Sequence, residues 1–237
     1  LAQELCNHLF DHLKLQQTKS VYLAVKYNPP AQNLYNTLGF KKLSGIVMKK
    51  DLVSSENLTQ RVDCSQDYYL QQLDYSEFAL VSALLCQPAQ MYNFDFTENL
   101  FSTKYKPLKK FLPVFPKLIT HIQRIKGSAF CLKNKRTKTT LGIAYIKAPP
   151  ANLRTDSAIL DFFILDDSLN YAIPLINKTL EHFRSKNSSQ VLCYILDCDH
   201  IKKQILNQLN AATYSLLPCS IKLSNHFYPT SIYKLVK

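Results

Sequence analysis

The sequence predicts an α/β fold of the α+β type, with a mixed central sheet flanked by helices. Segments with strand-like alternation follow segments with helical spacing along most of the chain, an order typical of layered sheets and helices. Of the 237 residues, 46% are hydrophobic and 19% are charged, so the chain can bury a core. The order helix, strand, helix, short strand occurs twice, which indicates a weak internal repeat.

The first unit is expected over residues 1–52. Its first helix carries leucines at positions 1, 5, 9 and 13, which fall on one stripe. An alternating strand, a helix opened by two prolines and closed by Gly39, and a short strand follow it. The expected ranges are 1–16, 21–25, 29–38 and 46–48. The chain opens inside the first helix without a capping residue, which favours a cut through a larger domain.

Residues 53–72 are polar and weakly patterned, so we expect a linker there, and residues 73–237 should form the second unit. This unit begins with an apolar helix for which Ser76 is the candidate cap. An irregular stretch rich in proline and aromatic residues over 100–120 is followed by alternating patterns. These patterns predict a helix over 115–125, strands over 128–134, 139–148 and 157–165, a helix after Pro174, a strand over 191–196, a helix over 200–212 and a strand over 231–237.

The net charge of +12 would suit nucleic acid, an anionic membrane surface or a phosphate-bearing cofactor, and would equally reflect a solvated basic surface. The densest basic cluster contains no aromatic residues, which is more typical of a hairpin tip than of a nucleic-acid platform. It consists of Lys133, Lys135, Arg136 and Lys138. The four glycines are widely separated, which excludes a Gly-rich phosphate loop.

Seven scattered cysteines form no C-x-x-C pair, so neither a structural zinc site nor a redox pair is expected. His8 and His12 have the spacing of two zinc ligands but no evident third ligand, and we predict no metal site. The sequence shows no secretory signal and no apolar run of about 20 residues. These features favour a reduced, cytoplasmic protein without a membrane partner.

Three further groups of residues allow two interpretations each. Asp166 and Asp167 could act as a base or metal site, or could form a turn after a strand. Cys193 and Cys198 could be buried thiols, or one could be a nucleophile, which would need a histidine partner. The third group is aromatic and could be core or a ligand cage; it consists of Phe94, Phe96, Phe101, Phe111 and Phe115.

One stretch carries a specific pattern, L-x-V followed by N-x-x-A-x-x-L-Y-x-x-x-G-F. The matching residues are Leu23-Ala24-Val25, Asn28, Ala31, Leu34-Tyr35 and Gly39-Phe40. Type, order and spacing agree together, and the stretch resembles the GCN5-related N-acetyltransferase (GNAT) family. The resemblance implies a GNAT-like sheet and binding of acetyl-CoA. Upstream, residues 1–5 are similar to the end of the family's pyrophosphate loop, where a helix N-terminus faces the anion.

The resemblance also implies roles for individual residues. Tyr35 would be the general acid that protonates the leaving thiolate. Asn28 would bind the amide arm of the cofactor at the end of a strand that splays from its neighbour. The full set expected at the cofactor is Leu1, Ala2, Gln3, Val25, Asn28 and Ala31. No catalytic base follows, because in the family it usually comes from strands that precede the loop.

The second unit is similar to the same family only in its packing pattern. On the loop pattern, Leu169, Ala172 and Pro174 stand where a basic residue, Gly and Gly or Ala belong, and Pro174 has no N–H to donate. On the strand–helix pattern, Leu206 replaces Tyr35 and Asp199 replaces Asn28. Asn210-Ala211 stands in the place of Gly39-Phe40. We therefore expect a degenerate GNAT-like domain that serves as a scaffold or a wall beside the substrate.

Together these features favour an acetyl-CoA-dependent N-acetyltransferase, acting on an amine that is a small molecule or part of a peptide. The chain alone is expected to be an inactive fragment with one partial unit and one complete degenerate unit. The alternatives are a non-catalytic interaction or scaffold module and, less favoured, a basic nucleic-acid-binding accessory domain. An incomplete first unit would expose a sheet edge, which favours a homo-oligomer.

Overall fold

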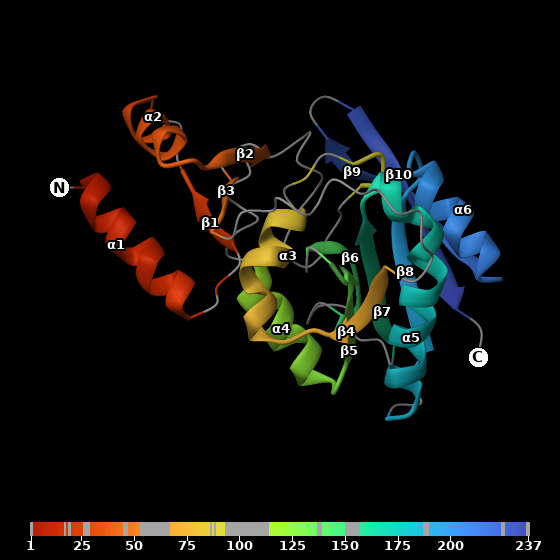
Figure 1. The fold of residues 1–237 in the computed structure, drawn as a ribbon. Helices are drawn as coiled ribbons and strands as arrows, with labels where there is room; N and C mark the ends of the chain where they lie inside the picture. The colour runs from red at the N-terminus through yellow and green to blue at the C-terminus, as the bar shows by residue number, and fades with distance from the viewer. Residues whose placement is uncertain are drawn as a thin grey trace. The chain divides into compact units, whose positions relative to one another are not determined.

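The computed structural model contains two compact units, Leu1–Gln66 and Asp67–Lys237 (Figure 1). The structure describes residues 2–16, 18, 20–25, 29–44, 47–52, 67–85, 87, 89–92, 114–136, 139–149, 157–186, 190–223 and 226–235. Within these ranges, no helix has the length and apolar character that a membrane crossing requires.

Unit 1 combines two helices with a three-stranded antiparallel sheet. Its elements are α1 (Ala2–Leu15), β1 (Ser20–Ala24), α2 (Pro29–Thr37), β2 (Lys41–Ser44) and β3 (Val47–Asp51). Strand β3 lies between β1 and β2. Its buried core consists of Phe10, Val25, Leu38, Phe40, Met48 and Leu52. The sequence patterns located both helices and two strands but missed β2, which is short and polar.

Unit 2 is a seven-stranded sheet with helices on its faces. Its elements begin with β4 (Tyr68–Gln72), η1 (Tyr75–Glu77), α3 (Phe78–Leu85), α4 (Val114–Arg124), β5 (Ser128–Asn134), β6 (Thr140–Lys147) and β7 (Ser157–Ile164). They continue with η3 (Asp166–Tyr171), α5 (Ala172–Arg184), β8 (Gln190–Leu196), α6 (His200–Gln208), β9 (Ala212–Leu223) and β10 (His226–Leu235). The prediction of a mixed sheet flanked by helices is confirmed.

The strand order of unit 2 is β4-β5-β6-β7-β8-β10-β9. Neighbouring strands are antiparallel except β7 and β8, which are parallel and joined through α5, as a parallel connection requires. Helices α3 and α4 lie on one side of the sheet, and α5 and α6 lie on the other (Figure 1). Alternate strand residues such as Leu160, Phe162 and Ile164 face α5 and form the main core.

Unit 1 has the topology of the second half of unit 2. The order α1-β1-α2-β2-β3 corresponds to α5-β8-α6-β9-β10, and the sheet order β1-β3-β2 corresponds to β8-β10-β9. The repeat inferred from sequence therefore has a structural counterpart.

Several details differ from the expectations. Residues 68–72, placed in the linker 53–72, form β4, whereas residues 53–66 lie outside the described residues. Ser76 lies inside the 3₁₀ helix η1 and does not directly precede α3. Strand β9 was not expected at all. Phe115 is fully buried beside the rings of Tyr75 and Phe78, which favours the core interpretation; Phe94, Phe96, Phe101 and Phe111 lie outside the described residues.

Candidate functional site

Helix α2 carries Tyr35, and the geometry at the end of this helix accounts for the spacing of Tyr35, Gly39 and Phe40. Gly39 has φ +84°, and its N–H donates to the carbonyl of Asn36 at 2.9 Å, while the N–H of Phe40 donates to that of Tyr35 at 2.9 Å. This pattern is a Schellman cap, in which Gly takes the left-handed position. The rings of Tyr35 and Phe40 lie 5.7 Å apart and form the apolar contact that accompanies such a cap.

The same cap ends α6 in unit 2. Asn210 has φ +53°, its N–H donates to Asn207, and the N–H of Ala211 donates to the carbonyl of Leu206 at 3.0 Å. Leu206 therefore occupies the structural position of Tyr35. Asp199 directly precedes α6, just as Asn28 directly precedes α2 in the chain. The alignment of the two units from sequence is thus consistent with both helix ends.

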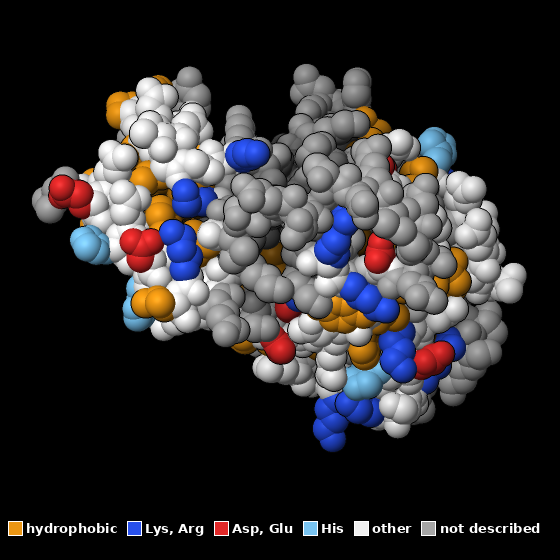
Figure 2. All heavy atoms as spheres, in the orientation of Figure 1, with side chains coloured by type: hydrophobic (Ala, Val, Ile, Leu, Met, Phe, Trp, Pro, Cys, Tyr) orange, Lys and Arg blue, Asp and Glu red, His pale blue; other side chains and the backbone are white. Residues whose placement is uncertain are grey.

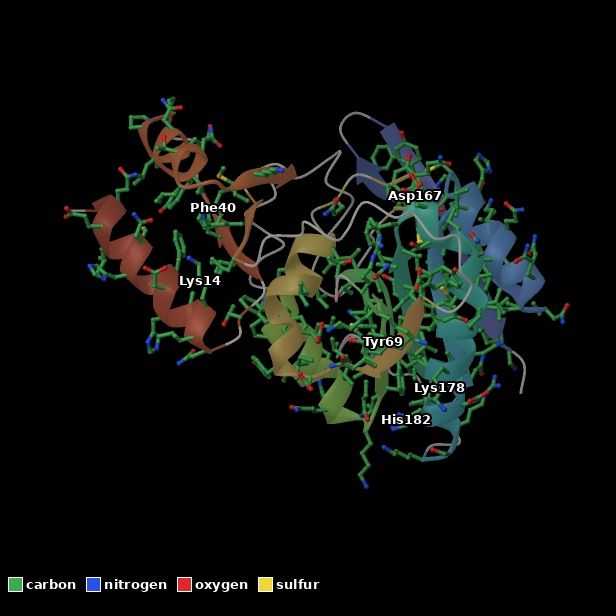
Figure 3. The ribbon with its side chains drawn as sticks, viewed as in Figure 1. Lys14, Phe40, Tyr69, Asp167, Lys178 and His182 are labelled. Atoms are coloured by element: carbon green, nitrogen blue, oxygen red, sulfur yellow. The ribbon has the colours of Figure 1, made fainter. Side chains whose placement is uncertain are left out.

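Tyr35 is half-buried against the core of unit 1, and among the described residues its hydroxyl has no hydrogen-bond partner. Lys50 supports the same helix end, because its ammonium donates to the carbonyl of Leu38 and lies 5.1 Å from the ring centre of Phe10. Figure 3 labels Phe40, which is buried under this helix end. The ring of Tyr35 is therefore held by packing against the core of unit 1.

The other predicted cofactor residues are placed as follows. Ala2 and Gln3 are exposed in the first turn of α1. Val25 is buried, with 6% of its surface exposed, so only its backbone could face a ligand. Ala31 is half-buried and packs on the same core as Tyr35. Leu1 and Asn28 lie outside the described residues.

Helix α1 has an apolar stripe with the spacing of the buried stripe of α5. The stripe residues are Ala2, Leu5, Cys6, Leu9, Phe10 and Leu13 in α1, and Ala172, Leu175, Ile176, Thr179, Leu180 and Phe183 in α5. All six are buried in α5, whereas Leu5 is 71% and Leu9 is 51% exposed in α1.

The difference between the two stripes follows from the sheets beneath them. Helix α5 packs on β5 and β6. In the sheet, these two strands and β7 lie on one side of β8, and β10 lies on the other side. Among the described residues of unit 1, no strand pairs with β1 on the corresponding side. The side of β1 that lies beneath the exposed leucines of α1 therefore has no described strand beside it.

In unit 2 the corresponding strands are both present, and they separate. The parallel ladder joins Ser157–Leu160 of β7 to Gln190–Cys193 of β8. Beyond this point the two strands continue to Ile164 and Leu196 without pairing to each other. Such a splayed pair is the geometry that the sequence resemblance implied for the cofactor arm.

The gap between these strands is filled by side chains of unit 2. Lys202 of α6, 1% exposed, forms an ion pair with Asp161 of β7 and lies 5.2 Å from the ring centre of Phe162. Tyr145 donates to the other oxygen of Asp161 at 3.1 Å. Burial alone would lower the pKa of Lys202, but the charges of Asp161 and Asp199 outweigh it and raise that pKa. The lysine is therefore a fixed charge inside the gap.

A short segment closes the end of the same gap. The backbone N–H of Gln90 donates to Asp166 Oδ1 at 3.0 Å, and the N–H of Tyr92 donates to Asp199 Oδ2 at 2.8 Å. Met91 between them is 1% exposed and belongs to the main core. The segment 90–92 thus connects the carboxylates that follow β7 and β8.

Asp166 and Asp167 occupy the first turn of η3, directly after β7. Asp166 binds the backbone of Gln90, so the structural interpretation of this pair is favoured for Asp166. Figure 3 labels Asp167 at the start of the α5 segment, and this side chain is exposed. Two carboxylates at this position would repel a pyrophosphate.

The two thiols considered from the sequence, Cys193 and Cys198, are described in the structure and show no sign of activation. Cys193 is fully buried, and burial together with Asp161 raises the pKa of its thiol. Burial also raises the pKa of the half-buried Cys198. Because the thiolate is the nucleophilic form, the buried-thiol interpretation is favoured for both. Across the described ranges, no three His, Cys, Asp or Glu side chains gather at a spacing that suits a metal ion.

The buried ion pairs were not found from sequence. Besides Lys202 and Asp161, Lys133 lies 2.5 Å from Glu77, and both are almost fully buried. Lys133 was expected in an exposed basic tip; this was wrong for Lys133, although the turn between β5 and β6 does expose Lys135 and Arg136. The signal in the sequence that could have indicated them was a charged residue within an otherwise apolar strand, such as Asp161.

A cavity of about 520 Å³ lies at the other end of the unit 2 sheet. Residues 72–75, the end of α4, Gly127 and Lys186 line it. It is near the beginning of β5 and the end of α5, whereas the filled gap is at the carboxyl ends of β7 and β8. None of the predicted cofactor residues lines this cavity.

No protein-family model and no curated protein match the sequence. Solved structures do match the fold. A ribosomal-protein-S5-alanine acetyltransferase from Vibrio fischeri has a TM-score of 0.55 at 7% identity, over 71% of this chain and 92% of that chain. A mutant spermidine/spermine N-acetyltransferase from Vibrio cholerae has a TM-score of 0.52 at 12% identity, over 72% and 94%.

A third match is the ribosomal L7/L12 alpha-N-protein acetyltransferase RimL in complex with coenzyme A, with a TM-score of 0.52 at 11% identity, over 72% of this chain and 94% of that chain. Unit 1 ends at Gln66, so matches of this extent must include most of unit 2. The family resemblance stated from sequence is confirmed at the level of the fold. The chain has the fold of the GNAT acetyltransferases.

Proposed function

We propose that the chain acts in acetyl-CoA-dependent N-acetylation of an amine, with the cofactor bound at unit 1 and not at unit 2. One observation carries this proposal. Helices α2 and α6 end in the same cap, but only α2 keeps a phenol at the matching position. Tyr35 is half-buried, whereas Leu206 is fully buried. Folding alone is satisfied by leucine there, so the hydroxyl is available for chemistry.

The residues of unit 1 fit the chemistry of the cofactor, which would supply an activated acetyl group. The exposed first turn of α1, with Ala2 and Gln3, offers N–H groups to the diphosphate. The open edge of β1 offers backbone groups to the amides of the arm, and Asn28 adds a side-chain amide next to α2. Tyr35 holds a transferable proton at its hydroxyl, which would neutralise the departing thiolate.

The amine substrate class draws support from the structural neighbours. Their names specify an alanine of a ribosomal protein, the ribosomal protein L7/L12, and spermidine or spermine. All of these carry amines, either on a small molecule or on a protein. We extend this class to the present chain as a proposal, together with a cytoplasmic location.

A second candidate function is a non-catalytic interaction module. The observation that favours it is the buried pair of Lys202 with Asp161, which lies where β7 and β8 stop pairing with each other. In this alternative, unit 2 serves as a scaffold. A nucleic-acid platform gains less support, because Figure 2 shows Lys and Arg side chains interspersed with acidic and hydrophobic ones on the face drawn.

The test uses the intact protein. Calorimetry measures the binding of coenzyme A, and the release of free thiol measures acetyl transfer. Asn28→Ala should weaken binding of coenzyme A. Tyr35→Phe should leave that binding unchanged and lower kcat by about 10²–10⁴-fold. Tyr214→Phe, an exposed tyrosine of unit 2, is the matched control and should change neither.

Each result bears on one part of the proposal. Full activity of Tyr35→Phe would remove the catalytic role of Tyr35. Absence of coenzyme A binding in the unmodified protein would refute the acetyltransferase proposal and favour the interaction module. If coenzyme A binding survives Asn28→Ala but is lost when residues of unit 2 are changed, the cofactor binds at unit 2 and the proposal is wrong.

A further inference from the structure

The cavity of about 520 Å³ at the start of β5 has an apolar floor and a charged rim. The floor consists of buried lining residues of α4 and β5, which are Ile119, Ile122 and Ala129. The rim consists of exposed lining residues, among them Asp74, Lys126 and Lys186. Small-molecule sites are usually concave and mostly apolar, with a few polar groups and a volume of about 300–1,000 Å³. The cavity has these properties.

The two lysines of the rim come from the ends of two different helices. Helix α4 ends at Arg124, just before Lys126, and α5 ends at Arg184, just before Lys186. The two helices lie on opposite sides of the sheet (Figure 1). Figure 3 labels His182 and Lys178 on α5, at the same end of unit 2. The cavity therefore lies where segments from both sides of the sheet meet beside the start of β5.

Lys126 takes a backbone conformation that lysine rarely adopts. Its φ is +50°, its N–H donates to the carbonyl of Gln123 at 3.1 Å, and the N–H of Gly127 donates to that of Ile122 at 2.8 Å. These bonds form the same Schellman cap that ends α2 and α6, where Gly and Asn take the left-handed position. A lysine costs more there than either of these residues. The cap therefore does not explain why a lysine stands at this position on the rim.

Lys186 is held by hydrogen bonds that reach the start of β5. Its ammonium lies 3.0 Å from His182 Nε2, and His182 Nδ1 lies 3.0 Å from Ser128 Oγ. Because an ammonium can only donate, Nε2 accepts and Nδ1 donates its proton to Ser128. Ser128 is 1% exposed, and the His182 ring lies edge-on to that of Phe130 at 5.4 Å. This bond uses one of the three N–H groups of the ammonium, which is thereby positioned to bind an anion with the others.

The charges of the rim favour a ligand with a single negative charge. Lys126 and Lys186 contribute two positive charges and Asp74 contributes one negative charge, which leaves +1. A carboxylate balances this charge, whereas a phosphate dianion would be repelled more strongly by Asp74. The floor has no charged residue among its three members, so it suits the apolar part of the same ligand.

We propose that this cavity binds a small amphipathic carboxylate. The carboxylate lies between Lys126 and Lys186, and the apolar chain or ring lies on the floor of the cavity. The site belongs to unit 2, and the inference does not depend on the acetyltransferase proposal.

Calorimetry of the intact protein tests the proposal with three probes. Octanoate has both the charge and the chain, octanamide has the chain without the charge, and acetate has the charge without the chain. Octanoate should bind about tenfold more tightly than octanamide, which cannot form charge-assisted bonds with two ammonium groups. It should bind about a hundredfold more tightly than acetate, because the longer chain leaves water. Equal affinity of octanoate and either other probe would overturn the proposal.

Two variants test the lysines directly. Lys126→Gln and Lys186→Gln remove the charge but keep most of the length, and each should weaken octanoate binding by about tenfold. The matched control is Lys135→Gln, an exposed lysine just after the other end of β5, which should bind octanoate as the unmodified protein does. Thermal melting should show that all three variants stay folded. Octanoate binding that either rim variant leaves unchanged would refute the assignment of the site.

NMR of the unmodified protein supplies a measurement that needs no variant. Burial and the charges of Lys186 and Lys178 lower the pKa of His182. A carboxylate bound at Lys186 offsets part of this charge, so saturating octanoate should raise the pKa of His182 toward 6.5. The ring signals of the exposed His200 should stay in place. Octanoate that binds without moving the signals of His182 would occupy another site, and the proposal would be wrong.

Discussion

Replacing Lys202 by Met tests whether the gap of unit 2 is held shut by a buried ion pair. Met keeps the length and apolar contacts of the lysine, including the contact with the ring of Phe162. It removes the charge that faces Asp161, a side chain with 6% exposure. Asp161 would keep its hydrogen bonds from Tyr145 and from the N–H of Phe162, but its charge would lose its partner.

The expected loss is about 3–5 kcal/mol of unfolding free energy, the range found when one partner of a buried pair is removed. For a domain of this size the loss corresponds to a fall in Tm of roughly 10–15 °C. Adding Asp161→Asn should recover most of it, because the Asn oxygen can accept from the N–H of Phe162, its amide N–H can donate to the hydroxyl of Tyr145, and no unpaired charge remains. Urea denaturation followed by circular dichroism measures both variants and the unmodified protein.

The matched control is the neighbouring pair on the same helix. Lys203 pairs with Asp197, but their side chains are 25% and 42% exposed. Lys203→Met should therefore cost less than about 1 kcal/mol, as partly exposed pairs do. If Lys202→Met cost no more than Lys203→Met, the pair with Asp161 would not be what closes the gap.

Three further predictions follow from the described contacts. Gly39→Ala should destabilise unit 1 by about 1–2 kcal/mol in urea denaturation, because φ +84° is strained for any residue with a Cβ; an unchanged midpoint would contradict the cap. The hydrogen bond from Lys203 leads the effects that lower the pKa of Asp197, so its stabilisation is complete above the unfolded value near 3.8 and is lost as the pH falls through the lower folded value. Asp197→Asn should flatten that acid loss, and an identical pH profile would disprove it. Burial and the charge of Lys186 lower the pKa of His182, so NMR titration should give a value below 6.5 that rises in Lys186→Gln; a value at or above 6.5 would be inconsistent with the contacts.

The elements found from sequence are those with strong apolar periodicity. Strands β5 to β8 and helices α1, α2, α5 and α6 are of this kind, because their apolar residues form runs in the strands or recur at helical spacing in the helices. Strand β2 was missed because Lys41–Ser44 is short and polar. Strand β9 was missed because its exposed half contains no buried residue and Pro218 interrupts it. Edge strands are held by one neighbour, so their sequences carry little of the pattern.

Contacts between residues far apart in the chain could not be predicted from the sequence either. Lys202 and Asp161 lie 41 residues apart, and nothing in either local pattern names the other as a partner. The comparison of the two strand–helix units, by contrast, needed only local spacing. It aligned Tyr35 with Leu206 and Gly39 with Asn210 from spacing alone, and both helices end in the cap that this alignment requires.

That shared cap divides the motif into a part that folding explains and a part that it does not. Gly39, Phe40 and the ring of Tyr35 are all used by the end of α2. Helix α6 makes the same end with Leu206, Asn210 and Ala211 and therefore shows that the hydroxyl is not needed for it. The hydroxyl of Tyr35 is thus the part of this residue that the shared cap does not explain. The function that we propose for the stretch therefore depends on the hydroxyl of Tyr35 and on the amide of Asn28, and not on the Gly-Phe pair that makes the motif easy to recognise.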